Sequence, residues 1–145
     1  MYLVDTNVLS EERRGKKADA GVDAFLHTWR DLIFVPVQAI GELKKGVEAS
    51  IQRGDLPQAM RLQAWFEKIL QTHRERILPF DIDCALAWGK LMGACDQNPL
   101  DRQIAAIALV YDLTVVTRNT RHYTGTGARV LNPFEADTPE AASIP

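Results

Sequence analysis

Four oxygen-bearing side chains from distant parts of the chain are of the types that bind a hard divalent cation. Asp5 follows a short apolar run, Tyr2-Leu3-Val4, and Asn119 follows another, while Glu42 and Asp101 lie near the beginnings of two predicted helices. Carboxylates that meet at one place repel each other, or have raised pKa values, unless a cation lies among them. Oxygen ligands without His or Cys favour Mg²⁺ or Mn²⁺ over zinc or copper.

Each acid also has an ordinary structural explanation. Asp5 can cap the helix that begins at the next residue, and Asp101 can stabilise the positive end of its own helix. Glu42 lies away from the apolar stripe of its helix, so an exposed position accounts for it. Asp81 and Asp83 flank a strand-to-helix turn, are best explained as caps, and are left outside the site.

The remaining polar candidates are weaker. His122 follows Asn119 closely and can contact a phosphate or donate a proton, although a solvent-facing histidine is the simpler expectation. Basic residues that can contact phosphate gather in two short segments, although such clusters are usually solvated surface; they are Arg13, Arg14, Lys16, Lys17, Arg118 and Arg121.

Composition indicates one globular domain. The 145 residues are 46% hydrophobic and 25% charged, and the formal net charge of −2 gives no overall attraction for nucleic acid. The longest apolar run, 104–111, is far shorter than the roughly 20 residues of a membrane span, and no secretory signal opens the chain. We therefore expect a cytoplasmic protein without a membrane segment, in which Cys84 and Cys95 remain reduced.

The elements that must position these residues alternate between strand and helix. Apolar runs predict strands at 2–4, 32–35, 77–78, 113–116 and 129–131. Helical periodicity predicts helices from residue 6, over 18–30, over 37–51, from 57 to about 73, after 81 and over 99–112, the third and fourth forming a hairpin. This alternation predicts an α/β fold with a mostly parallel sheet of four to five short strands and helices on both faces.

The helix over 99–112 has a clear beginning. Asn98 is a favoured N-cap and Pro99 a favoured first residue. Residues 104–111 are apolar on every side, which predicts a fully buried helix. We place the domain at 1–134 and expect the acidic, alanine-rich tail 135–145 to be poorly ordered.

Four motifs together resemble a PIN-domain ribonuclease of the VapC/FitB type, the toxin half of bacterial toxin–antitoxin pairs. The resemblance covers nearly the whole chain, and four motifs in order are specific where one would be weak. They are Tyr2-Leu3-Val4-Asp5-Thr6-Asn7-Val8, Ile40-Gly41-Glu42-Leu43, Asp101-Arg102-Gln103-Ile104-Ala105-Ala106 and Val116-Thr117-Arg118-Asn119-Thr120-Arg121-His122-Tyr123.

The resemblance implies a PIN-like three-layer sandwich with Asp5, Glu42 and Asp101 as the metal-binding acids and Asn119 in the fourth position. Many relatives place a further acid where this chain has His122. We therefore expect one firmly bound Mg²⁺, with Mn²⁺ as an alternative, and a second ion only with the RNA phosphate.

The implied activity is metal-dependent endonucleolytic hydrolysis of RNA. Asn119, with Thr6 or Thr117, would orient water or phosphate, and Arg118 and His122 would help to position substrate. The family further implies a homodimer and a cognate antitoxin that blocks the site, with DNA bound only through the antitoxin because this chain has no DNA-reading motif.

Three alternatives compete with this interpretation. A haloacid dehalogenase phosphatase needs a second Asp where this chain has Asn7, and a receiver domain needs a Lys after its last strand, although no Lys follows Lys90. A degenerate PIN domain that binds RNA or a partner without cutting it agrees with the neutral Asn119. Metal-dependent turnover separates this last alternative from a nuclease.

Overall fold

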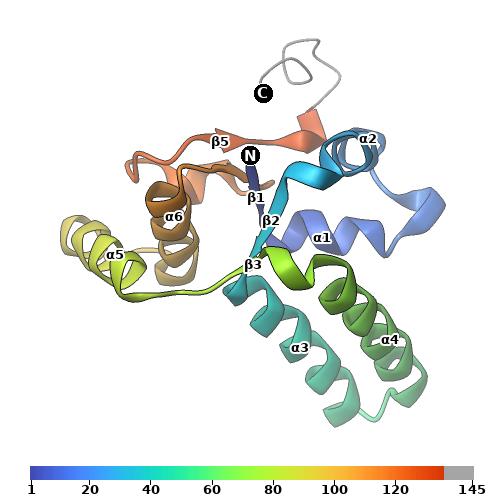
Figure 1. Cartoon of the computed structure of the whole chain (residues 1–145). Helices are drawn as coiled ribbons and strands as arrows, with labels where there is room; N and C mark the ends of the chain where they lie inside the picture. Colours follow the sequence, from blue (N-terminus) through green and yellow to red (C-terminus); the bar gives the residue numbers. More distant parts are fainter. Residues whose placement is uncertain (136–145) are drawn as a thin grey trace.

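The computed structural model describes residues 1–135, in which a five-stranded parallel sheet lies between two groups of helices (Figure 1). The strands are β1 (Tyr2–Val4), β2 (Ile33–Pro36), β3 (Ile77–Leu78), β4 (Thr114–Val116) and β5 (Val130–Leu131), in the order β3-β2-β1-β4-β5. All four pairings are parallel, so the predicted α/β class and sheet are confirmed. Of the predicted tail, residues 136–145 lie outside the described residues.

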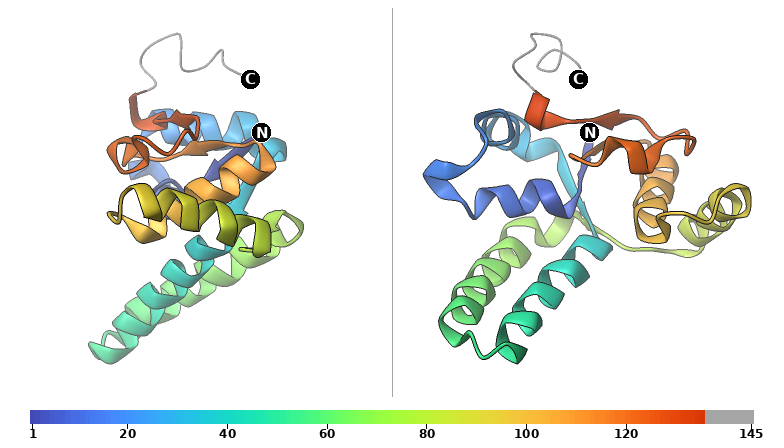
Figure 2. Two further views of the ribbon diagram at one scale, coloured as in Figure 1. Left: turned by 90° about the vertical axis from the view of Figure 1, so that its left-hand side faces the viewer. Right: turned by 180° about the vertical axis from the view of Figure 1, so that it is seen from behind.

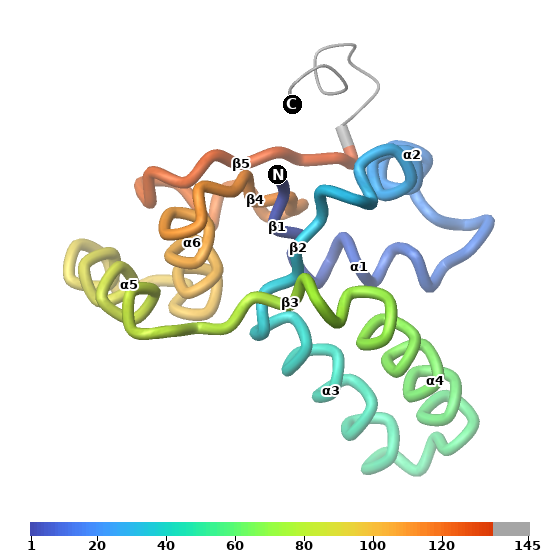
Figure 3. The backbone as a smooth tube through the Cα atoms, viewed as in Figure 1, coloured from blue at the N-terminus to red at the C-terminus, as the bar shows by residue number. Residues whose placement is uncertain are grey.

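Side chains along β1 alternate between the two faces of the sheet, as a strand period of two residues requires. Tyr2 and Val4 pack into one apolar cluster, whereas Leu3 between them packs into the other. Both faces are covered, which explains why the central strands are continuous apolar runs. Figure 3 shows β1 in the middle of the sheet, with β2 and β4 beside it.

Within residues 1–135, six α-helices cover the sheet in two groups. The first cluster contains residues of α1, α2, α3 and α4, and the second contains residues of α5 and α6. Figure 2 shows α3 and α4 as a hairpin that extends away from the sheet, which confirms that prediction. The helices are α1 (Thr6–Glu12), α2 (Ala20–Trp29), α3 (Val37–Gln52), α4 (Leu56–His73), α5 (Ile82–Ala94) and α6 (Pro99–Tyr111).

Two expectations for α6 need correction. Of the run 104–111 only residues 104–108 are buried, whereas Leu109 and Val110 are 41% and 38% exposed. α6 packs against α5, β4 and the short 3₁₀ helix η4 (Thr120–Tyr123), and these contacts leave Leu109 and Val110 in its last turn partly exposed. Asn98 precedes the helix as predicted, but it has a left-handed backbone with φ 51° and its side chain makes no capping hydrogen bond.

Smaller differences concern the boundaries. β2 begins one residue later than predicted and includes Pro36, and α2 begins after the capping Asp19. The turn at 125–127 has positive φ angles at Gly125 and Gly127, which glycine adopts without strain. Cys84 and Cys95 are not disulfide-bonded, as expected. No helix in residues 1–135 combines the length and apolar character of a membrane span.

Candidate active site

Asp5 is fixed where β1 ends and α1 begins. Its backbone N–H donates to the carbonyl of Val116 at 3.0 Å, which continues the pairing with β4. The side chain is 3% exposed; Oδ1 accepts from the backbone N–H of Thr6 at 2.8 Å and Oδ2 from the hydroxyl of Thr117 at 2.9 Å. Asp5 therefore caps α1, as its structural explanation predicted, and also holds a carboxylate at the carboxyl edge of the sheet.

A buried network surrounds the Oδ2 atom of Asp5. The Thr117 hydroxyl donates to this atom and accepts from Asn7 Nδ2 at 3.2 Å and from the backbone N–H of Asn119 at 3.1 Å. The Tyr123 hydroxyl also donates to Oδ2, at 3.4 Å. Sequence reasoning did not assign Asn7 or Tyr123 to the site, although both lie inside the motifs that carry Asp5 and Asn119.

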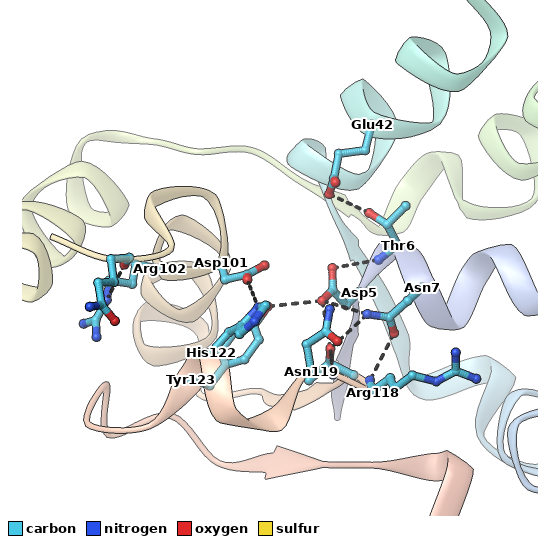
Figure 4. A network of polar contacts seen from close by, with 12 residues as sticks. Asp5, Thr6, Asn7, Glu42, Asp101, Arg102, Arg118, Asn119, His122 and Tyr123 are labelled. Carbon is cyan, nitrogen blue, oxygen red and sulfur yellow. Dashed lines mark hydrogen bonds and ion pairs between the residues drawn. The ribbon is translucent and has the colours of Figure 1, made fainter. Parts of the chain in front are cut away.

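Glu42 reaches the same edge from the second turn of α3. Its Oε1 accepts a hydrogen bond from the Thr6 hydroxyl at 2.8 Å, which links α3 to the start of α1 (Figure 4). The side chain is half-buried, so the expectation of a freely exposed position was wrong. The helical period alone could not reveal this contact, because α1 covers the side of α3 that looked solvent-facing.

Asp101, in the first turn of α6, is paired with His122 from η4. Nδ1 of His122 lies 2.7 Å from Oδ2 of Asp101, and both residues are half-buried. A carboxylate oxygen accepts, so a hydrogen bond from the ring to Asp101 requires the tautomer of His122 that has its proton on Nδ1. The His122 side chain is 43% exposed, so it still faces solvent as expected, but its contact with Asp101 also brings it to the acids.

Asn119 and Arg118 differ from the other candidates. Asn119 is exposed at the same edge, and no described residue hydrogen-bonds to its side-chain amide. The Arg118 guanidinium lies 3.8 Å from the ring centroid of Phe134 and points away from Asp5 (Figure 4). Only the backbone N–H of Arg118 takes part in the network, through a hydrogen bond to Asn7.

The electrostatics of this edge disfavour uncompensated negative charge. Burial is the main cause that raises the pKa of Asp5, and the charges of Asp101 and Glu42 raise it further, while the Thr117 and Thr6 hydrogen bonds lower it. Burial and the nearby Asp5 raise the pKa of Tyr123 far above its usual range, so its hydroxyl stays protonated and can donate. A cation at this edge would relieve the repulsion.

The donor set fits a hard divalent cation, although the three carboxylates are not gathered around one point. No described residue hydrogen-bonds to Oε2 of Glu42 or to Oδ1 of Asp101, so both atoms keep free lone pairs. Among residues 1–135, however, no group of three or more His, Cys, Asp or Glu side chains lies close enough together to hold a metal ion. Binding by all three acids therefore requires Glu42 and Asp101 to turn further toward Asp5.

Comparisons with known proteins find a matching family and similar sequences. The sequence profile of the PIN domain matches residues 2–125, which include every residue of the site described above. The chain is 26% identical to the VapC ribonuclease Y4jK of Sinorhizobium fredii, over 93% of this chain and 99% of that protein. It is 29% identical to toxin FitB of Neisseria gonorrhoeae, over 92% of this chain and 99% of that protein.

A solved structure has the same fold over nearly the full length. The crystal structure of FitAcB from Neisseria gonorrhoeae superposes with a TM-score of 0.75 at 30% identity, and the match covers 93% of this chain and 99% of that chain. The agreement therefore includes both groups of helices and the α3–α4 hairpin as well as the sheet.

Proposed function

This chain belongs to the PIN domain family, and we propose that it is a metal-dependent endoribonuclease toxin of a toxin–antitoxin pair. The observation that carries the proposal is the arrangement of Asp5, Glu42 and Asp101, which reach one sheet edge from three separate elements. The similarity to a VapC ribonuclease and to toxin FitB supports the reaction and the biological role.

Asp5, Glu42 and Asp101 would hold the cation, with Mg²⁺ favoured and Mn²⁺ also suited to oxygen ligands. When bound, such an ion supplies charge stabilisation at the phosphate and lowers the pKa of water. The raised pKa of Asp5 fits this role. Burial and the neighbouring carboxylates disfavour the ionised form of Asp5, and a bound cation would stabilise that form.

The protein's own side chains hold the acids in place. Thr117 and the Thr6 backbone fix Asp5, the Thr6 hydroxyl fixes Glu42, and His122 fixes Asp101. Asn119 is exposed and its amide is free of described partners, so it can orient a phosphate oxygen or the attacking water.

We further propose that the chain works as a homodimer and is inhibited by a cognate antitoxin, with DNA bound only through that antitoxin. A cationic antitoxin side chain that entered this edge would compensate the same charge as the metal and so compete with it. The antitoxin would thereby block cleavage without reshaping the fold.

The test is cleavage of total cellular RNA by the purified chain, freed of antitoxin, with Mg²⁺ or Mn²⁺ and with EDTA. We expect metal-dependent fragments that disappear with EDTA and in the Asp5→Asn variant but persist in Asp83→Asn, an exposed acid of α5. Equal cleavage by Asp5→Asn and by the unmodified chain would refute the assignment of the site.

A second candidate function is a PIN domain that binds RNA or a partner without cutting it. The observation that favours it is the position of His122, which faces Asp101 where many relatives carry another acid. A folded protein that binds RNA with the same affinity with and without Mg²⁺, and leaves it intact, would support this alternative.

A further inference from the structure

A groove with a mixed polar and apolar lining leads away from the acids between α1, α3 and α4. It has a volume of about 330 Å³, and Thr6 and Glu42 line one end of it. Arg13, Arg53 and Trp65 line it farther away. Figure 2 shows α1 beside the α3–α4 hairpin, and residues of these three helices line the groove. The volume is at the lower end of ligand pockets and suits a group of nucleotide size.

Two arginines supply positive charge to this groove without neutralisation by the described residues. Arg13 is the C-cap of α1 and Arg53 the C-cap of α3, and both are exposed. No described carboxylate lies within ion-pair distance of either guanidinium, whereas Arg14 nearby is paired with Glu11. Arg53 donates one hydrogen bond, to the Ser50 hydroxyl at 3.0 Å, and keeps its other donors for a ligand.

Trp65 provides an aromatic surface in the same groove. The indole is half-buried and packs against the apolar cluster beneath, so its orientation is fixed by the core. The guanidinium carbon of Arg13 lies 5.6 Å from the centroid of the ring, within cation–π distance. A flat base can stack on the indole or on the guanidinium, because both present a planar face.

We infer that this groove is a subsite for the RNA strand beside the cleavage position, in which Trp65 stacks on a base while Arg13 and Arg53 contact backbone phosphates. The inference rests on the proposed function and adds to it the path of the substrate. From Thr6 to Arg13, α1 advances about 10 Å, and a stacked strand advances about 3.4 Å per nucleotide. The subsite therefore lies within about three nucleotides of the acids.

The composition of the groove favours RNA over a protein segment. Positively charged side chains beside an aromatic ring are the usual means of binding single strands without reading their sequence. The groove also begins at Glu42, where the scissile phosphate would lie, so one continuous strand can occupy both places. The net charge of −2 makes such local contacts necessary, since no overall field attracts the substrate.

The test measures the affinity for a short, fluorescein-labelled single-stranded RNA of mixed sequence as a function of salt. All variants are made in the non-cleaving Asp5→Asn background with EDTA, so that binding is measured apart from catalysis. Each phosphate contact contributes about 0.7 to the slope of log K against log salt for a single strand. We expect Arg13→Gln and Arg53→Gln each to lower this slope by about 0.7, and the double variant by about 1.4.

Trp65→Leu should weaken binding by about 5- to 150-fold while the salt slope stays unchanged, because stacking is not ionic. Trp65→Phe should restore much of the affinity, which distinguishes stacking from damage to the core. Arg74→Gln is the matched control, since it removes the same charge at a different place. Arg74 precedes β3 and so lies where the strands begin, whereas the acids lie where the strands end.

The outcome that overturns the inference is an unchanged affinity and slope in the Arg13→Gln, Arg53→Gln double variant. If RNA affinity and slope are unchanged and the double variant also fails to co-purify with an antitoxin, the groove binds protein and not RNA. Neither result depends on whether the chain cleaves RNA, so failure of the subsite and failure of the proposed function remain distinguishable.

Discussion

Nδ1 of His122 and Oδ2 of Asp101 lie 2.7 Å apart, and this contact ties the loop after β4 to the first turn of α6. Residues that orient a candidate metal ligand act on its position without binding the cation themselves. His122 therefore controls how Asp101 is presented.

Replacement of His122 by Ala should lower RNA cleavage by about 10- to 100-fold, the usual cost of losing such an orienting partner. Part of the loss should be recovered at higher Mg²⁺ concentration, since a poorly held ligand weakens affinity more than chemistry. His122→Asn can place a donor near the position of Nδ1 and should retain more activity than Ala. Equal activity of the Ala variant and the unmodified chain at limiting Mg²⁺ would show that the contact is only structural.

Mg²⁺ should raise the melting temperature of the chain without any RNA present. A ligand that binds only the folded state at 100 times its Kd stabilises by about 2.7 kcal/mol. The comparison is made in EDTA with KCl at equal ionic strength. Glu42→Gln should reduce the shift, whereas Glu48→Gln, an exposed acid paired with Lys44 on the same helix, should leave it unchanged. A shift of the same size in Glu42→Gln would remove Glu42 from the set of ligands.

The strands and the α3–α4 hairpin could be predicted because local signals and tertiary packing agree there. The predicted strands 77–78 and 2–4 match β3 and β1, since short apolar runs between turn residues have few alternatives. Asp5 and Thr117 end up together because both follow strands that pair in parallel, as the topology requires.

The remaining contacts depend on packing that no local pattern encodes. Glu42 is half-buried because α1, distant in sequence, covers it, and His122 meets Asp101 because η4 folds back onto α6. Arg118 turns to Phe134, although its neighbours Thr117 and Asn119 face the acids or the open edge. In each case the partner comes from another element, so spacing along one element could not predict it.

Asp81, which caps α5, should stabilise the fold at neutral pH and lose this effect in acid. The Cys84 backbone N–H and then the Tyr111 hydroxyl, 2.7 Å away, lower the pKa of Asp81. A carboxylate whose pKa is depressed by folding stabilises above its unfolded pKa, about 3.9, and this contribution is lost as the pH falls through the folded pKa.

Asp81→Asn should therefore be less stable than the unmodified chain at pH 7, and the difference should shrink below about pH 4, where Asp81 becomes protonated. Urea unfolding at both pH values measures this difference. Asp83→Asn is the control, because Asp83 lies in the same first turn but accepts no hydrogen bond from Tyr111. A difference that does not change with pH would contradict the account.

The two halves of α6 should respond differently to truncation, although both are apolar in sequence. Ile104 is fully buried against the sheet, so Ile104→Ala should cost about 2–5 kcal/mol of unfolding free energy. Leu109 is 41% exposed. Leu109→Ala should cost less than about 1 kcal/mol, because truncation of a side chain already partly in solvent removes less buried apolar surface. Equal costs in urea unfolding would mean that the last turn of α6 is covered in solution, as the sequence alone had predicted.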